Sequence, residues 1–427
     1  MANYDYEIVN GRKIRVRPKE TVSEIDKNGY FRRQPNHFTT PFGDGENDLK
    51  AEGNKRYRLG WAKLCHWSNR AAIVRELEGL EDQISVNMVE HAPYEKNLGW
   101  EYVYNENNID PVLGDQFLSE AYYRADDDYQ GRTTVPALID TTTGKVVNND
   151  YNWLTTYFEV NFRPWHKKGA PELYPVELRE EIDKMNRSGK LPPLADTREK
   201  DYQTILAEIR ELPDGPELSP TANAKSSTAA AEEVKKKIAE PLDTMLNAVE
   251  LAQYVESAKQ FYGALEELET ALGATRFLTG DFVTEADAAL YVTLVRFDLL
   301  YSRYLGPVKY RVQDLKNVSD YLKDLYQIPA FAHHTDFAAI IRQGRIEGEK
   351  DGFRASTHYD LALPKIDWDA QWKVSTERAY LSSDPTHPIY LGNNRRFDID
   401  PTWYDLGAES PKKEEKETPP SCGCCCG

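Results

Sequence analysis

Cysteine is nearly absent from most of this chain. Its 427 residues hold five cysteines, and only Cys65 lies outside the final cluster of Cys422, Cys424, Cys425 and Cys426. A body with one cysteine has no internal disulfide framework, which suits a reducing compartment. We therefore expect a cytoplasmic protein.

Long apolar runs and excess positive charge are also missing. The N-terminal residues have no apolar stretch of the signal-peptide kind, and no segment reaches the ~18 apolar residues that a membrane span needs. With 53 Lys and Arg against 70 Asp and Glu, the net charge is −17. Such an acidic surface repels phosphate backbones and anionic lipids, so we expect no nucleic acid and no membrane as a partner. A local arginine or a helix N-terminus can still bind an anionic ligand.

Spaced metal ligands are missing from the body of the chain, which has no HExxH motif and no pair of CxxC motifs. We therefore expect no metal there. The terminal SCGCCCG leaves several uses open, because its thiols could bind a soft metal such as Zn²⁺ or Cu⁺, be acylated or act as a redox tail. Its spacing is too tight for the usual zinc site with two pairs of ligands.

The chain does contain an alternating pattern of strands and helices. Hydrophobic residues alternate over 57–61 and again over 84–88, which predicts two half-buried strands. Between them, a helical period at 71–77 follows Cys65. Strand, loop with cysteine, helix and strand together form a βαβ unit.

A hairpin is predicted after this unit. Residues 134–139 form a strand signal broken by Pro136, which belongs at a strand start and is a candidate for a cis bond. The turn at 140–145 leads into another short strand. Asp150 then follows as a predicted N-cap of a helix through Tyr157. The predicted sheet is therefore mixed, with one parallel pair and one antiparallel hairpin.

From about residue 175 the pattern is helical. The run Thr284-Glu285-Ala286-Asp287 predicts a capping box, and the apolar residues after it lie on one buried helix face through Tyr301. Two stretches rich in Pro, Ser, Gly and charge predict a flexible surface insertion. The chain thus divides into an irregular arm (1–52), an α/β domain (53–165), an all-helical domain (175–345) with the insertion at about 188–240, an extension (346–410) and a disordered Cys-rich tail (411–427).

Cys65 is the candidate reactive residue. It lies between a strand and the start of a helix, where the partial positive charge of the helix N-terminus favours the thiolate. Arg70 and His66 could add to this effect, although a lone histidine beside a cysteine is weak evidence and we predict a packing or surface role for it. A buried structural thiol is the alternative.

A peptide-like ligand would find partners near this thiol. The backbone of Val135, before Pro136, could pair with such a ligand as an added strand. Asp150 could bind its ammonium end and Arg132 a carboxylate. The order of cysteine, x-Pro and an acid at a helix start favours this interpretation over an independent structural role for each residue.

The sequence resembles a known family. The segments that carry the resemblance are GYFRRQPNHF (29–38), YRLGWAKLCHWSNRAAIVRELEGLEDQISV (57–86), LGW (98–100), YYRADDDYQGRTTVPALIDTTTGKVVNND (122–150), YPVELREEID (174–183) and RFLTGDFVTEADAALYVTLVRFDLLY (276–301). They are similar to the glutathione transferases, and more closely to the Xi class, the glutathionyl-hydroquinone reductases. TVP and TEAD occur widely among transferases, whereas YxGRxTVP and LVRFDxxY are more specific to this branch.

The resemblance implies a fold: an α/β thioredoxin-like N-terminal domain plus an all-α C-terminal domain, in a homodimeric enzyme. Glutathione, or another low-molecular-weight thiol, would be the co-substrate and an aromatic electrophile its partner. Cys65 would take the glutathionyl group from a glutathionyl-hydroquinone, and a second glutathione would resolve the mixed disulfide. The thiol would be bound by Trp100, Arg132, Val135, Pro136, Asp150 and Tyr151, and Tyr301 would face the aromatic substrate.

The sequence departs from the family at the site. His66 replaces a proline, Asn69 stands where a histidine is common, and Tyr151 replaces a serine. Two rivals therefore stay open. One is a non-catalytic thiol-binding or interaction protein on the same scaffold. The other is a conventional conjugating transferase, in which Tyr57 on the first strand of the α/β domain would activate the thiol.

Overall fold

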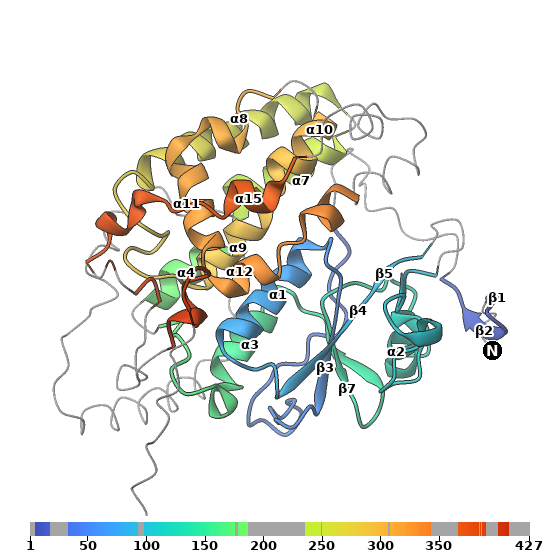
Figure 1. Cartoon of the computed structure of the whole chain (residues 1–427). Helices are drawn as coiled ribbons and strands as arrows, with labels where there is room; N and C mark the ends of the chain where they lie inside the picture. Colours follow the sequence, from blue (N-terminus) through green and yellow to red (C-terminus); the bar gives the residue numbers. More distant parts are fainter. Residues whose placement is uncertain are drawn as a thin grey trace, which may run out of the picture.

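The computed structural model describes residues 5–17, 33–92, 98–175, 178–186, 235–248, 250–305, 308–342, 366–383, 385, 387–389 and 400–409. A sheet region and a helical region lie against each other (Figure 1). The fold is therefore the predicted one, with a mixed α/β N-terminal region and an all-α C-terminal region. Residues 411–427, including the four clustered cysteines, and most of the predicted insertion lie outside the described residues.

The central sheet has the strand order β4-β3-β7-β8. Its strands are β3 (Tyr57–Trp61), β4 (Ile84–Met88), β7 (Ala137–Asp140) and β8 (Lys145–Asn148). The β3 and β4 strands are parallel, whereas β7 is antiparallel to both β3 and β8. The βαβ unit and the hairpin predicted from the sequence are both confirmed.

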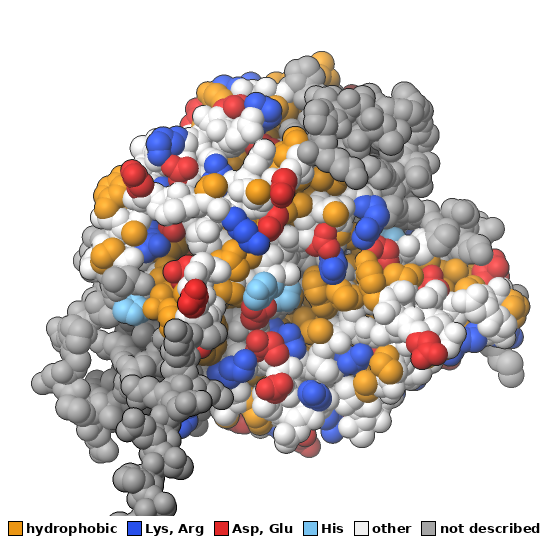
Figure 2. Space-filling view, viewed as in Figure 1, with side chains coloured by type: hydrophobic (Ala, Val, Ile, Leu, Met, Phe, Trp, Pro, Cys, Tyr) orange, Lys and Arg blue, Asp and Glu red, His pale blue; other side chains and the backbone are white. Residues whose placement is uncertain are grey.

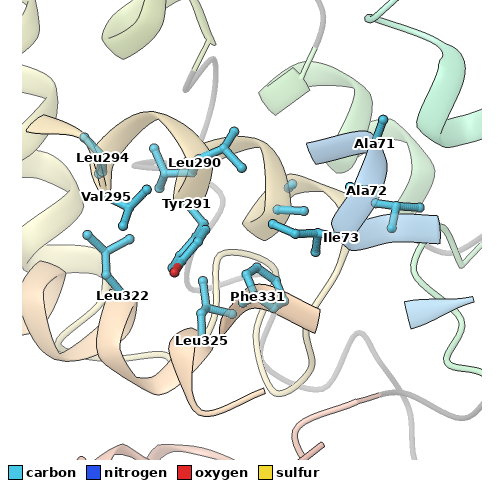
Figure 3. Close-up of a cluster of buried hydrophobic side chains, with 14 of the residues drawn as sticks. Ala71, Ala72, Ile73, Leu290, Tyr291, Leu294, Val295, Leu322, Leu325 and Phe331 are labelled. Atoms are coloured by element: carbon cyan, nitrogen blue, oxygen red, sulfur yellow. The ribbon is translucent and has the colours of Figure 1, made fainter. Parts of the chain in front are cut away.

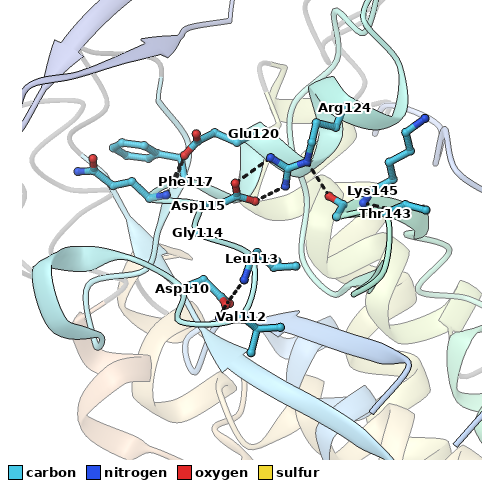
Figure 4. Close-up of polar contacts among 12 residues, drawn as sticks. Asp110, Val112, Leu113, Gly114, Asp115, Phe117, Glu120, Arg124, Thr143 and Lys145 are labelled. Carbon is cyan, nitrogen blue, oxygen red and sulfur yellow. Dashed lines mark hydrogen bonds and ion pairs between the residues drawn. The ribbon is translucent and has the colours of Figure 1, made fainter. Parts of the chain in front are cut away.

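Helices cover this sheet. On the side of the helical region lie α1 (His66–Leu77) and α3 (Leu154–Val160), which pack against each other, while α2 (Leu118–Ala125) packs against β8. Two short strands, β5 (Glu90–His91) and β6 (Trp100–Glu101), pair beside the sheet. A polar network holds the segment before α2: Asp110 accepts hydrogen bonds from the backbone N–H groups of Val112 and Leu113 (Figure 4).

After α4 (Arg179–Asn186), the helical region resumes inside the stretch that the sequence assigned to the flexible insertion. Residues 235–240 are helical, and Ile238 is buried because it packs into the core. The region comprises α4, α7 (Glu240–Asn247), α8 (Leu251–Ala271), α9 (Glu285–Leu294), a π-helical turn (Phe297–Tyr301), α10 (Ser302–Leu305), α11 (Lys316–Tyr326), α12 (Pro329–His333) and α15 (Trp368–Trp372).

The capping box predicted at Thr284 is present at the start of α9. The Thr284 N–H donates to the Asp287 carboxylate at 2.8 Å, and Asp287 also accepts from the Tyr321 hydroxyl of α11 at 2.8 Å. The cap therefore ties two helices together in addition to starting one. Burial raises the pKa of Asp287 to about 6, against the hydrogen bonds that favour its charge.

One core spans the contact between the two regions. Small residues on α1, Ala71 and Ala72, allow this helix to approach α9 closely, and Ile73 lies with them (Figure 3). Across from them stand side chains of α9 and α11, among them Leu290 and Leu325. The helix that follows Cys65 is therefore held by both regions.

The N-terminal arm is more ordered than the sequence predicted. The strands β1 (Tyr6–Val9) and β2 (Arg12–Arg15) form an antiparallel hairpin, whose turn uses the positive φ angles of Asn10 and Gly11. Phe42 is fully buried in the main core. The hairpin of the arm is local, whereas Phe42 packs against residues far along the chain, which no local pattern could predict.

The C-terminal extension packs on the helical region. Buried Arg378 donates to the backbone oxygens of Leu272, Thr275 and Arg276. Ile389 pairs with Val283 in an isolated parallel bridge. On the face seen in Figure 2, acidic and basic side chains are intermixed, so the net negative charge forms no single acidic patch there. No described helix is long and apolar enough to cross a bilayer.

Candidate active site

Cys65 is the N-cap of α1, directly after the turn that follows β3. Its N–H donates to the Ala62 carbonyl at 3.0 Å, and its own carbonyl accepts from the Asn69 N–H at 3.0 Å. The thiol is free and partly exposed. Cys65 therefore stands at the helix end whose first backbone N–H groups have no intrahelical acceptor, and its side chain makes no capping hydrogen bond.

The loop before β7 lies opposite this thiol. The Val135–Pro136 bond is cis. The Cys65 sulfur lies 3.5 Å from the Val135 carbonyl oxygen. Within the described part of the chain, the Val135 N–H donates to no acceptor, so it can pair with the backbone of a ligand laid beside it.

Trp100 supports the same loop from the other side. Its indole N–H donates to the Thr133 carbonyl at 3.2 Å, and its ring stacks on His91 at 3.7 Å between centroids. Trp100, Val135 and the partly buried Cys65 belong to one apolar cluster. The structure therefore brings these three predicted residues together.

The N-terminal arm contributes residues that the sequence analysis did not single out. The Gln34 amide accepts from the Arg132 N–H at 2.8 Å and donates to the Arg132 carbonyl at 2.9 Å. Asn36 donates to the Asp150 carboxylate at 3.0 Å. Arg132 and Asp150 are thus positioned by one short stretch of the arm. The signal was the RRQPNH sequence within the segment of resemblance at 29–38.

Asp150 does not cap a helix as predicted. Helix α3 begins four residues later, at Leu154, and its N-cap is Trp153. The Asp150 carboxylate instead accepts from the Asn152 N–H at 3.1 Å, which makes a local turn. Such a turn uses the carboxylate that a cap would need, and the helix starts only after the turn is complete.

Tyr151 packs beside the first turn of α1. Its ring lies 4.5 Å from the Trp67 ring between centroids. The Arg33 guanidinium carbon lies over the Tyr151 ring, 5.2 Å from the ring centroid. Its carbonyl accepts from the Arg70 guanidinium at 2.5 Å. Burial raises the pKa of Tyr151, so the phenol is neutral at physiological pH. The bulk of Tyr151 is therefore accommodated by tilted ring packing against Trp67.

His66 and Tyr301 approach each other across the two regions. The Tyr301 hydroxyl lies 3.5 Å from Nδ1 of His66, and Tyr301 is 8% exposed. Burial, followed by the charges of Arg296, Arg33 and Arg70, lowers the pKa of His66 well below its usual value. His66 is therefore neutral at pH 7, and its ring also packs against Trp67 at 4.4 Å between centroids, in keeping with the predicted packing role.

Tyr57 does not face this site. Its hydroxyl donates to the Lys50 carbonyl at 2.5 Å, and its ring packs on Phe42 at 5.4 Å between centroids. Burial raises the pKa of Tyr57 to about 12. The conjugating mechanism that depended on Tyr57 is therefore wrong, because the first residue of β3 lies at the strand end away from Cys65 and its hydroxyl is already committed.

Comparison with known proteins identifies relatives of this chain among the glutathione transferases. Residues 229–324 match the family described as glutathione S-transferase, C-terminal domain. The chain is 30% identical over 285 residues to the glutathionyl-hydroquinone reductase YqjG of Escherichia coli K12, a match that covers 67% of this chain and 73% of that protein. This chain belongs to the glutathionyl-hydroquinone reductases of the glutathione transferase superfamily.

Solved structures of this superfamily share the fold. The glutathione-bound structure of YqjG superposes with a TM-score of 0.56 at 25% identity, covering 85% of this chain and 96% of that one. The Xi transferase from Phanerochaete chrysosporium gives a TM-score of 0.57 at 26% identity, covering 73% and 90%. This chain has a cysteine at the start of α1 and an x-Pro loop opposite it. Among the described residues, no three His, Cys, Asp or Glu side chains are grouped to hold a metal.

Proposed function

We propose that this protein is a thiol-dependent reductase that removes glutathione from glutathionyl-hydroquinones through a Cys65 mixed disulfide. The observation that carries the proposal is the free Cys65 thiol at the N-terminus of α1, 3.5 Å from the Val135 carbonyl. The similarity to a glutathionyl-hydroquinone reductase over most of its length supports the same activity. The glutathione-bound neighbour supports glutathione as co-substrate.

The chemistry balances as a thiol–disulfide exchange. The Cys65 thiolate attacks the glutathionyl sulfur, a new S–S bond forms and the bond from sulfur to the aromatic carbon breaks. The electron pair leaves with that carbon, which takes up a proton to give the hydroquinone. A second glutathione thiolate then attacks the mixed disulfide, which releases Cys65 and glutathione disulfide. Overall, one glutathione thiol and the glutathionyl sulfur of the adduct form the disulfide, and the aromatic carbon is reduced.

We assign the binding roles as follows. Val135 pairs its backbone with the cysteinyl unit of glutathione, and Trp100 packs against that unit. Arg132 binds a carboxylate, and Asp150 with Tyr151 takes the γ-glutamyl end. The arm supports this assignment, because Gln34 and Asn36 hold Arg132 and Asp150 in place.

The aromatic substrate would lie on the helical side of the thiol. Tyr301 supports this placement, because its hydroxyl lies 3.5 Å from Nδ1 of His66, the first residue of α1. Neutral His66 can exchange a proton with Tyr301, so this pair is a candidate donor for the proton that the departing aromatic carbon takes up.

One specific observation favours a second candidate. Tyr151 replaces the serine that the family uses, and its ring is packed between Trp67 and Arg33. This packing reshapes the γ-glutamyl subsite, which would suit a related small thiol, or a binding protein without turnover.

A direct test uses full-length protein with the four tail cysteines replaced by serine, so that Cys65 is its only thiol. Turnover of glutathionyl-menadiol with glutathione is compared with that of the same protein carrying Cys65→Ser. We expect loss of at least ~1,000-fold in the variant, because no other described thiol can replace the nucleophile. Absence of turnover in the parent, with Cys65 still alkylated quickly, would indicate another thiol co-substrate. Slow alkylation as well would leave only the binding protein.

We also propose a homodimer in the cytoplasm. Support for the location is the single cysteine in residues 1–421, which needs no oxidising compartment. The dimer rests on the family resemblance alone, and light scattering on the full-length protein tests it directly.

A further inference from the structure

The hydroxyl group of Tyr122 is buried beside the loop that carries Val135. Tyr122 belongs to α2, and the residue is 0% exposed. Its Oη donates to the Thr134 carbonyl at 2.8 Å and accepts from the Thr134 N–H at 3.2 Å. One side chain therefore takes both backbone hydrogen-bonding groups of the residue before Val135.

A second side chain fixes the direction of this hydroxyl. Asn149 is fully buried after β8, and its Oδ1 accepts from the Phe38 N–H at 2.9 Å. Its Nδ2 lies 3.3 Å from the Tyr122 Oη and 3.1 Å from the Thr134 Oγ1. Because the Tyr122 Oη accepts from Asn149 and from the Thr134 N–H, its single proton is left for the Thr134 carbonyl. Burial raises the pKa of Tyr122, so the phenol keeps that proton at physiological pH.

These bonds determine where the Val135 N–H points. The peptide bond between Thr134 and Val135 is trans. A trans peptide unit is planar, so its C=O and N–H groups point in opposite directions. Since the Thr134 carbonyl is directed at Tyr122, the Val135 N–H is directed away from α2, and it meets no acceptor within the described part of the chain. The same bond that satisfies one end of the peptide unit leaves the other end open to a ligand.

The ring of Tyr122 has a separate role from its hydroxyl. It packs edge-on against the Phe38 ring at 5.4 Å and beside the Tyr129 ring at 5.3 Å, both between centroids. Tyr129 donates its own hydroxyl to the Arg132 carbonyl at 2.6 Å, two residues before Thr134. A phenylalanine at position 122 would keep the ring contacts and lose only the bonds to Asn149 and Thr134.

We propose that Tyr122 is a positioning residue for the thiol ligand: its hydroxyl orients the peptide unit between Thr134 and Val135, so that the Val135 N–H faces the backbone of the glutathionyl group. Tyr122 acts through this peptide unit and does not contact the ligand. The inference rests on the proposed function in taking Val135 as the backbone partner of glutathione. A peptide unit that is already oriented raises affinity, because binding does not have to order it.

The test is the affinity for S-methylglutathione, a thioether that cannot form a mixed disulfide, measured by calorimetry on full-length protein without tail cysteines. Tyr122→Phe should bind it with a Kd about fivefold above that of the parent, because the hydrogen bond that orients the peptide unit is lost. Asn149→Ala should weaken binding in the same direction, because the hydroxyl loses the donor that directs it. Tyr174→Phe is the matched control: it removes another buried hydroxyl, which donates to Asp183 of α4 at 2.7 Å, and should leave the Kd unchanged.

The rate of Cys65 alkylation by iodoacetamide distinguishes orientation of the loop from a general loosening of it. Cys65 is partly buried, with its sulfur 3.5 Å from the Val135 carbonyl. A loosened loop would uncover this thiol and speed its alkylation, whereas loss of orientation in one peptide unit should leave the rate within about twofold of the parent. A merely structural role of Tyr122 would lower the melting temperature without changing the Kd, as expected for Tyr174→Phe.

Two results would overturn the proposal: a Tyr122→Phe protein that binds S-methylglutathione with the parent's Kd, or one whose weaker binding is accompanied by much faster alkylation of Cys65. Asn149→Ala carries the comparison if Tyr122→Phe does not fold. Binding needs no turnover, so a parent that binds S-methylglutathione in a Tyr122-dependent way but does not turn over glutathionyl-menadiol would refute the proposed activity alone. A parent that does not bind S-methylglutathione would refute glutathione as the co-substrate and this inference with it.

Discussion

Asn36 donates a hydrogen bond of 3.0 Å to the carboxylate of Asp150, across 114 residues of sequence. The N-terminal arm therefore orients Asp150, an acid of the proposed glutathione subsite that does not serve as a helix N-cap. Asn36→Ala should raise the KM for glutathione about fivefold and leave kcat unchanged, because one hydrogen bond contributes ~1 kcal/mol. Steady-state kinetics measure this. Gln130→Ala, which removes an exposed amide in the loop before Arg132, should change neither constant, and an equal effect of both variants would contradict the role of Asn36.

Tyr151 can be tested by separating its ring from its hydroxyl. Tyr151→Phe keeps the stacking on Trp67 and should leave the KM for glutathione within about twofold, because burial already keeps the phenol neutral. Tyr151→Ser restores the hydroxyl that the family uses and should lower that KM, while loss of the buried ring lowers stability by roughly 2–4 kcal/mol. Kinetics and urea denaturation of the two variants measure these effects. A higher KM in the serine variant would show that the ring itself contacts the thiol.

The buried carboxyl group of Glu78 should make the free energy of unfolding depend on pH. It lies buried at the end of α1, with its carboxylate 2.8 Å from Nδ1 of His166. Burial, against hydrogen bonding from Glu159, raises the pKa of Glu78 from 4.5 to about 8. Because the folded-state pKa of Glu78 lies above the unfolded one, the stability contributed by neutral Glu78 is complete below pH 4.5. That stability is lost as the pH rises through 8, by about 1.4 kcal/mol per pH unit.

Glu78→Gln removes this ionisation. Its melting temperature should therefore exceed that of the wild type at pH 9 and match it or fall below it at pH 5. Thermal unfolding at both pH values measures the difference, and Glu106→Gln, at an exposed carboxyl, serves as the control. A difference between Glu78→Gln and wild type that is equal at pH 5 and pH 9 would refute the titration of Glu78.

Thr284 tests the capping box away from the site. Thr284→Ala should lower the free energy of unfolding by about 1–2 kcal/mol, because it removes the side chain that caps α9. Urea denaturation measures this loss, and kcat and KM should stay at their wild-type values. Thr270→Ala, on the exposed end of α8, is expected to be nearly neutral.

Local patterns predicted the elements around Cys65 well. Alternation over β3 and β4, and the helical period after Cys65, depend on neighbours in sequence, so the βαβ unit could be predicted with its parallel pairing. The capping box at Thr284 was equally local. Asp150 shows the limit of such reasoning, because a cap and a side-chain turn use the same residue type, and only the position of Leu154 separates them.

The rest of the site depends on contacts that no local pattern encodes. Gln34 meets Arg132 across 98 residues, and Arg296 meets Leu64 across 232. Arg296 was visible only within the LVRFDLLY segment, and its burial and its bond to the Leu64 carbonyl depend on the fold. Tyr57 failed as a candidate for the opposite reason, because its position on a strand did not reveal which end of the strand faces the thiol.

Arg378 has a consequence for how this protein is made. Its guanidinium binds carbonyl oxygens that lie 102–106 residues earlier in the chain, at the end of α8 and just beyond it. During synthesis those oxygens leave the ribosome long before their partner does. Until the extension is synthesised, the helical region lacks these hydrogen bonds. We therefore expect its final folding step to occur late in translation. Ribosome-bound chains halted before residue 378 should be cut readily by protease in this region.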